Sequence, residues 1–247
     1  MKISFIIPCF NSELIIKKSI KKLEKKLNKI KKFSYELIII DDGSTDKTKK
    51  VINSIKDKKI KVITNSVNLG KSTSLIKGIK LSKYNRIIII DCDLPYFQYL
   101  DKVIRLLKNN DFIYINRRSS QSKLDNKKLN FYQTCRYFIS RMVCFIINLL
   151  LLNKKTGDTQ AGLKGFNKPK HFNKIKFLSK KFFFDAELMI LFYRSKAKML
   201  SIPLKYKIYE DSTIKIVALE NFVYLFELLK VILFYKIKET KKITLET

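Results

Sequence analysis

The chain has 247 residues, enough for one α/β domain with a full core, and 46% of them are hydrophobic, which argues against a disordered protein. Lysine and arginine outnumber aspartate and glutamate by 52 to 21, and the net charge of +31 favours polyanionic partners unless it reflects biased composition alone. A single histidine and four cysteines without a C-x-x-C spacing argue against a histidine-based triad and a zinc site.

Strands and helices alternate over the first ninety residues. Short apolar runs predict strands at residues 3–7, 36–40, 60–64 and 86–90. Apolar residues at helical spacing predict helices after the first three of these strands. This alternation is typical of right-handed β-α-β units, and it predicts an α/β fold with a mostly parallel sheet flanked by helices.

The second half of the chain has a different pattern. Residues 111–115 predict a fifth strand, and residues 119–128 a polar linker. Residues 131–152 and 214–237 predict two long apolar helices, interrupted by charged side chains such as Arg136 and Lys230. We expect them to lie on a membrane surface, with buried core helices as the alternative, and we expect no spanning helix and no secretory signal.

Two carboxylates follow the fourth predicted strand in the stretch RIIIIDCDLPY, residues 86–96. Asp91 and Asp93 are two residues apart, so they point to the same side if the strand geometry persists. Like charges this close resist joint ionisation, and a positive partner is therefore expected. Because Mg²⁺ and Mn²⁺ prefer carboxylate and phosphate oxygens, one such ion is expected to join the pair to a diphosphate.

Four stretches occur in order at strand ends: IIPCFNSE, IIIDDGSTDKT, NLGKSTSLIKGI and IIIIDCDLP. Together they closely resemble the family 2 glycosyltransferases, which have the Rossmann-like GT-A fold. The resemblance implies a nucleotide-sugar site. It assigns Asp91 and Asp93 to the metal and diphosphate, and Ile40 and Asp42 to the base. The remaining donor contacts that it implies are Pro8, Phe10, Glu13 and Lys71, with Phe10 where the family usually has tyrosine.

Later stretches narrow the resemblance. GDTQAGLKGF, FFFDAELMI and SIPLKYKIYEDSTIKI resemble dolichyl- or polyprenyl-phosphate sugar transferases, which move a hexose from a UDP- or GDP-sugar to a lipid phosphate. This resemblance implies that Asp158 and Gln160 lie beside the metal or sugar. It also implies that Arg117 and Arg118 clamp the acceptor phosphate, although NRRSS departs from the usual small residue, serine and arginine at this place.

We therefore predict an inverting glycosyltransferase, peripheral on the cytoplasmic membrane face, with the catalytic residues Asp93, Asp158, Arg117 and Arg118. The domain is expected over residues 1–210, with the nucleotide half at about 1–118 and the acceptor half at about 119–210. An amphipathic membrane-surface segment is expected over 211–247. The expected partners are a nucleotide sugar, a lipid phosphate and an anionic membrane, without specific nucleic acid.

Two alternatives follow from the same sequence. The first is transfer to a saccharide hydroxyl in surface polysaccharide synthesis, which needs a general base, for which Asp158 and Glu187 are the candidates. The second is a non-catalytic protein that binds lipid or polyanions. Retention of the D-x-D pair and of Asp42 favours an enzyme over this second alternative.

Overall fold

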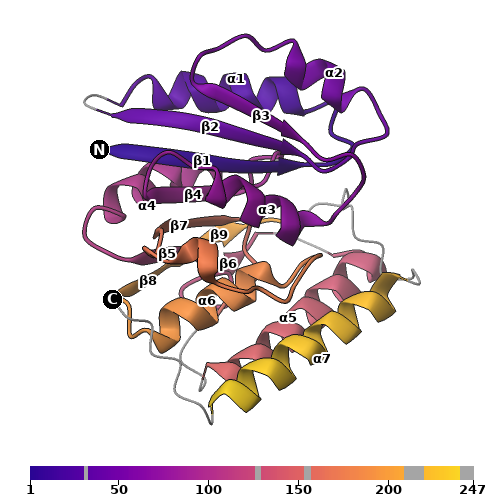
Figure 1. Ribbon diagram of the computed structural model, residues 1–247. Helices are drawn as coiled ribbons and strands as arrows, with labels where there is room; N and C mark the ends of the chain where they lie inside the picture. Colours follow the sequence, from indigo (N-terminus) through magenta and orange to yellow (C-terminus); the bar gives the residue numbers. More distant parts are fainter. Residues whose placement is uncertain (31–32, 126–128, 153–156, 209–219, 240–247) are drawn as a thin grey trace. The chain divides into compact units, whose positions relative to one another are not determined.

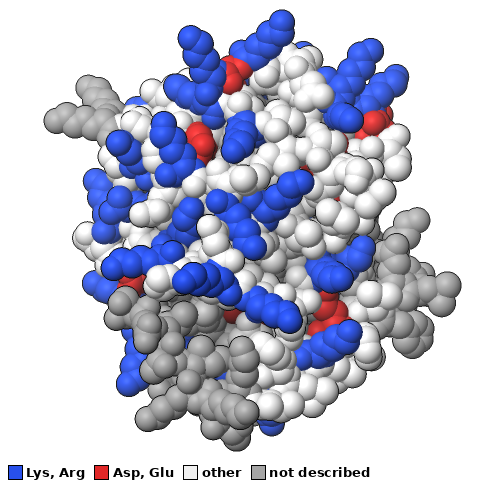
Figure 2. Space-filling view, in the orientation of Figure 1, with Lys and Arg blue, Asp and Glu red and all other residues white. Residues whose placement is uncertain are grey.

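The computed structural model describes the chain except residues 31–32, 126–128, 153–156, 209–219 and 240–247. The chain divides into two compact units. The first comprises Met1–Ile113 and Gly162–Lys176, and the second Tyr114–Ala161 and Phe177–Thr247. Lysine and arginine side chains spread over the face seen in Figure 2, with few acidic side chains among them.

The first unit is built on strands in the order β3-β2-β1-β4-β7. Their bounds are β1 (Lys2–Cys9), β2 (Ser34–Asp41), β3 (Ile60–Thr64), β4 (Arg86–Ile90) and β7 (Leu163–Asn167). The pairs β1–β2, β1–β4 and β2–β3 are parallel, which confirms the predicted β-α-β pattern. The antiparallel pairing of β7 with β4 was not predicted. The four isoleucines of β4 are all at most 1% exposed, as expected for a strand covered on both faces.

Helices cover this sheet (Figure 1): α1 (Ile16–Leu27), α2 (Thr48–Asn53), α3 (Lys71–Lys80), the short η1 (Phe97–Tyr99), α4 (Leu100–Leu106) and η2 (Phe172–Lys174). The buried residues of α1 recur every three or four positions, which is the predicted amphipathic spacing. Gly78 brings α3 close to the sheet, because a Cβ there would lie 2.7 Å from a side-chain carbon of Ile40.

The second unit combines short strands with long helices. Strand β5 (Phe112–Ile115) begins in the first unit and ends in the second. It is followed by α5 (Phe131–Leu151), α6 (Phe184–Arg194), β8 (Met199–Ile202) and α7 (Glu220–Glu239). The predicted polar linker contains a strand, β6 (Lys123–Leu124), which pairs in parallel with β9 (Lys205–Tyr206). Most of the predicted second apolar helix is α7, while residues 214–219 lie outside the described part.

Helices α5 and α7 lie side by side (Figure 1) and pack with α6 in one apolar cluster. Ile147 and Leu151 of α5 contribute to it, as do Ile190 of α6 and Val231 and Ile232 of α7. Both long helices therefore bury one face, so the alternative that they are core helices is correct for part of their surface.

The outer faces of these helices are also apolar. On α5, Phe138, Met142 and Phe145 are 63%, 57% and 61% exposed, and on α7, Phe226 and Leu233 are 59% and 60% exposed. By length and hydropathy, α5 is the one helix in the described part of the chain that would suffice to cross a membrane, with 22% of its apolar window buried. Buried core helices of soluble proteins also have this length and hydropathy, and the predicted absence of a spanning helix stays a prediction.

Candidate active site

Two loops of the first unit are tied together where β1 and β2 end. Asn11, in the left-handed region at φ 47°, accepts the N–H of Thr45 on its side-chain oxygen at 2.9 Å. Glu13 accepts the N–H of Lys47 at 2.7 Å. The second bond occupies one carboxylate oxygen of Glu13, which was predicted as a donor contact. Phe10, in the same loop, is 36% exposed and offers a ring face for stacking.

Asp42 is the centre of a hydrogen-bond network. It is 4% exposed. One carboxylate oxygen accepts hydrogen bonds from Asn65 Nδ2, Leu69 N and Ser74 Oγ at 2.9–3.0 Å, and the other accepts the Gly70 N–H at 2.9 Å. Asp42 thereby fixes the loop that leads into α3. Its four partners leave little capacity for a bound base, so its assignment to the base stays a prediction.

A cavity of about 270 Å³ lies beside Asp42, at the ends of β2 and β3, lined by Asp41, Gly43, Ser44, Lys49, Thr64, Asn65 and Ser66. Pro8 and Ile40, both predicted as donor contacts, are buried opposite each other in the strands behind it. One oxygen of Asp41 accepts the Ser44 N–H at 3.0 Å. Its other oxygen is buried and has no hydrogen-bond partner among the described residues. Asp41 is thus a carboxylate with one unused acceptor, and the sequence prediction did not include it.

The predicted metal pair lies on the turn after β4. Lys71 Nζ is 2.6 Å from Asp91 Oδ1. That oxygen accepts no hydrogen bond of normal geometry from the described residues. The nearby ammonium of Lys71 is therefore what offsets its negative charge. Partial desolvation, and then the charge of Asp91, raise the pKa of Asp93, while a backbone hydrogen bond and the charge of Lys71 act in the opposite direction. The structure thus brings Asp91, Asp93 and Lys71 together, and Lys71 forms its ion pair with Asp91.

Gly162 gives the Asp91 carboxylate its space. A Cβ at Gly162 would lie 2.2 Å from Asp91 Oδ2, and the Asp91 N–H donates to the Gly162 carbonyl at 3.2 Å. No group of three or more His, Cys, Asp or Glu side chains suited to a metal occurs in the described part of the chain. Two carboxylates at the surface are a donor set that Mg²⁺ or Mn²⁺ accepts when phosphate oxygens complete the coordination, so the residues fit a divalent ion.

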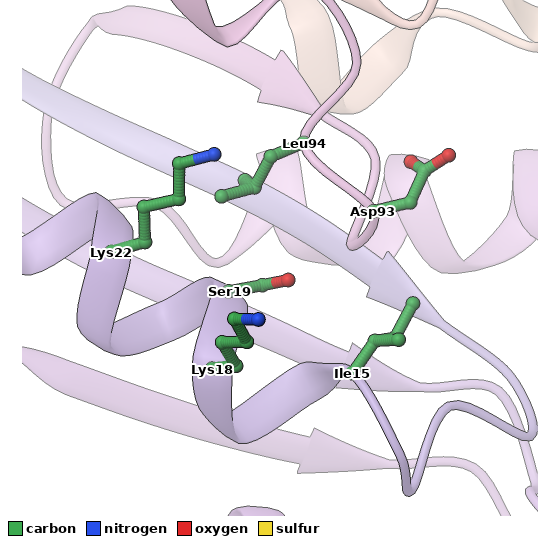
Figure 3. A pocket seen from close by; sticks show the side chains of 6 residues that line it. All are labelled: Ile15, Lys18, Ser19, Lys22, Asp93 and Leu94. Carbon is green, nitrogen blue, oxygen red and sulfur yellow. The ribbon is translucent and has the colours of Figure 1, made fainter.

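The loop that carries Asp93 has a strained backbone. Leu94 and Tyr96 have φ angles of 53° and 58°, in the left-handed region that residues other than glycine rarely adopt. Figure 3 shows Leu94 reaching towards α1 while the Asp93 carboxylate points the other way. A cavity of about 210 Å³ lies beside this loop and is lined by Ile15, Lys18, Ser19, Lys22, Asp93 and Leu94. Strain of this kind is typical of functional loops.

In the second unit, Arg117 and Asp158 form a buried ion pair. Arg117 donates through Nε and Nη2 to the two oxygens of Asp158, the second bond being 2.9 Å long. Asp158 is fully buried, which by itself would raise its pKa. The Arg117 guanidinium outweighs that effect and lowers the pKa of Asp158 to about 2. Arg117 is therefore committed to a side chain of its own unit.

Asn116 organises this site, and sequence reasoning did not single it out. Its Oδ1 accepts the N–H groups of Arg118 at 3.0 Å and Asp158 at 3.2 Å. Gly157 leaves room for it, since a Cβ there would lie 2.4 Å from Asn116 Oδ1. Gln160 contributes its N–H to Asp158 at 3.1 Å, and its Nε2 has no partner within the described ranges. The sequence feature that could have pointed to Asn116 is the NRRSS stretch, in which Asn116 stands where the family usually has a small residue.

Arg118 extends from this network to α5. Its Nη2 donates to Ser140 Oγ at 2.5 Å, and its guanidinium lies 5.7 Å from the ring centre of Tyr137. Arg141 lies 5.3 Å from the same ring and donates to the Tyr137 hydroxyl at 3.0 Å. Two guanidinium groups thus share one aromatic ring beside the apolar outer face of α5. Of Arg117 and Arg118, which were predicted to clamp the acceptor phosphate, Arg118 is the one that reaches α5.

Comparison with known proteins gives a consistent picture. The model of the family "Glycosyl transferase family 2" matches residues 4–195. A dolichyl-phosphate beta-glucosyltransferase of Trichomonas vaginalis is 25% identical over 95% of this chain and 74% of its own length. The dolichyl-phosphate beta-glucosyltransferase of Homo sapiens is 28% identical over 77% of this chain and 62% of its own length.

Solved structures support the fold. Glucosyl-3-phosphoglycerate synthase from Mycobacterium tuberculosis, in complex with Mn²⁺, UDP-glucose and phosphoglyceric acid, aligns with a TM-score of 0.67. The alignment covers 94% of this chain and 79% of that chain at 14% identity. At this level of identity the likeness concerns the fold, and it agrees with the mostly parallel sheet flanked by helices that the sequence predicted.

Proposed function

The chain belongs to glycosyltransferase family 2, and we propose that it moves a hexose from a nucleoside diphosphate to a polyprenyl phosphate at a membrane surface. The curated relatives above are named for dolichyl phosphate, which supports a lipid-phosphate acceptor. A glycosyltransferase with that acceptor needs three things from its own residues: a donor site, a site for the acceptor phosphate, and charge balance for the leaving diphosphate.

One observation carries the choice of acceptor: both candidate general bases are already engaged. Asp158 is buried against Arg117 with its pKa lowered to about 2, so it is a weak base. Glu187 is fully buried, and its oxygens accept the N–H groups of Leu178 and Ser179 and the hydroxyl of Tyr235 at 2.7–3.1 Å. A hydroxyl acceptor needs a base, whereas a lipid phosphate is already an oxyanion at neutral pH. The geometry therefore favours the phosphate.

For the donor, Asp91 and Asp93 are proposed to hold Mg²⁺ or Mn²⁺. Such an ion, when bound, supplies positive charge to the leaving diphosphate. Asp91 is kept in place by Gly162 and Lys71. Burial and the charge of Asp91 raise the pKa of Asp93, and added positive charge would oppose that effect. The structural neighbour in complex with Mn²⁺ and UDP-glucose supports a divalent ion in general.

We favour a UDP-sugar over a GDP-sugar because of Asp41. Its single unused oxygen is buried at the wall of the cavity, where a base would have to reach it. It would then suit one N–H donor, as the imide of uracil provides, while guanine presents two parallel donors that a carboxylate binds best with both oxygens. The exposed ring of Phe10 is proposed to stack on the donor.

For the acceptor, Arg118 and Arg141 are proposed to bind the lipid phosphate beside the exposed stripe of α5. This stripe is spaced along one helix face and consists of Phe138, Met142, Phe145 and Leu149. With the apolar outer face of α7, it forms a surface suited to the interfacial region of a bilayer, at which the polyprenyl chain is held. Attachment is proposed to be peripheral, since Arg136 and Arg141 would each cost about 2.5–3.5 kcal/mol at the bilayer centre.

The test is a donor and acceptor screen with the full chain. UDP-glucose, UDP-galactose and GDP-mannose are each incubated with Mn²⁺ and either a short polyprenyl phosphate or an oligosaccharide, and the products are identified by mass spectrometry. We expect a glycosyl phosphopolyprenol from a UDP-hexose. Transfer to the oligosaccharide alone would refute the lipid acceptor, and transfer from GDP-mannose alone would refute the assignment of Asp41 to uracil.

A further inference from the structure

Lys71 occupies a position in a helix where a positively charged side chain is unfavourable. It is the first residue of α3, a ten-residue helix with no acidic residue in its first turn. The N-terminus of a helix carries partial positive charge, so a lysine is disfavoured there. Such a local violation is expected where a residue serves a site. Its partner is Asp91, with Nζ 2.6 Å from Oδ1, and both side chains are partly buried, at 25% and 28% exposure.

The backbone holds Lys71 where it is. Gly70, with φ 96°, gives the turn before α3 a conformation that other residues rarely adopt. The Gly70 N–H is fixed by the buried carboxylate of Asp42 at 2.9 Å. The loop that Asp42 organises therefore fixes the backbone from which the Lys71 side chain extends, and the ion pair with Asp91 holds its ammonium.

Asp91 is equally restrained. Its Oδ2 lies against Gly162, where even a Cβ would approach to 2.2 Å, and its N–H donates to the Gly162 carbonyl. The carboxylate cannot turn away from Lys71 on that side. Any cation that binds Asp91 must therefore compete with an ammonium that is already in contact with it.

From this arrangement we propose that Lys71 is an internal counter-ion of Asp91, which suppresses metal binding in the empty site and makes it depend on the donor diphosphate. The proposal rests on the donor site proposed above. Without a nucleotide, Lys71 and a divalent cation repel each other across one carboxylate. When a diphosphate is bound, its negative charges accept the displaced ammonium, and the repulsion is relieved. Lys71 is then a positioning residue that couples two binding events.

The experiment measures Mn²⁺ binding by the loss of the free-ion signal in electron paramagnetic resonance, with and without UDP, so it does not depend on turnover. K71M removes the charge and keeps an unbranched side chain. We expect it to tighten Mn²⁺ binding to the nucleotide-free protein about tenfold and to reduce the effect of UDP on that affinity. K71R keeps the charge and should bind Mn²⁺ like the wild type.

K80M is the matched control, since Lys80 is an exposed lysine at the other end of the same helix. It removes the same charge and should leave both affinities unchanged. Equal nucleotide-free affinities in K71M and the wild type, with UDP still promoting binding in both, would refute the coupling and leave the donor site intact. If UDP promotes Mn²⁺ binding in neither protein, the donor site itself is refuted, and the coupling with it.

Discussion

Replacing Gly162 with alanine tests the geometry on which the metal assignment depends. The new Cβ would lie 2.2 Å from Asp91 Oδ2 and 2.9 Å from its Cγ. Ordinary contact begins at 3.4 Å, so the carboxylate must retreat by the difference of 3.4 and 2.2, which is 1.2 Å. A displacement of about 1 Å at a reacting group costs roughly 10²-fold in rate. We therefore expect G162A to lose about two orders of magnitude in transfer.

The assay compares transfer rate, UDP-dependent Mn²⁺ affinity and thermal stability. The control is G165A in the same segment, where a Cβ would meet the side chain of Val103 at 2.9 Å and not a site residue. G165A should lower stability with little effect on Mn²⁺ affinity, whereas G162A should weaken Mn²⁺ binding beyond any loss of stability. Wild-type transfer and Mn²⁺ affinity in a folded G162A protein would refute the proposed role of Asp91.

Three further outcomes are expected. Asp93→Ala should abolish transfer in a folded protein because several kcal/mol of transition-state stabilisation are lost, and near-normal turnover with Mn²⁺ present would contradict the metal assignment. The pKa of Asp158 is about 2 in the folded chain against an ordinary 3.8, so the ionised carboxylate stabilises the fold above about pH 4 and this stabilisation is lost as pH falls towards 2. Denaturant unfolding should show the free energy of unfolding decreasing over this pH range. Arg117→Leu should lower it by about 3–5 kcal/mol already at pH 7. Phe138→Ser combined with Phe226→Ser should reduce flotation with anionic liposomes, and unchanged flotation of the double variant would exclude these faces as the attachment surface.

Local patterns in the sequence were sufficient for the first sheet. Strands β3 and β4 have the predicted bounds because a buried parallel strand is a continuous apolar run with polar residues at its end. The same property located the turn with Asp91 and Asp93. The antiparallel strand β7 was not predicted, since its place next to β4 depends on a return of the chain over more than seventy residues.

The site was predictable in its residue types more than in its contacts. Asp42 was identified as a key residue, but its four hydrogen bonds come from residues 65–74, and no local pattern reveals them. Asn116 and Gly162 were missed because each acts through space on a residue distant in sequence. Arg117 and Asp158 were both predicted as site residues, but their pairing in a buried ion pair depends on the fold and no local pattern reveals it.

The most direct test of the central claim is to compare two acceptors that differ in one group, a short polyprenyl phosphate and the corresponding polyprenol. The full chain is supplied with UDP-hexose and Mn²⁺, and the lipid product is followed by mass spectrometry. We predict transfer to the phosphate with inversion at the anomeric carbon, and none to the alcohol, because the two candidate bases, Asp158 and Glu187, are buried and already engaged. Transfer to the polyprenol at a similar rate would contradict it.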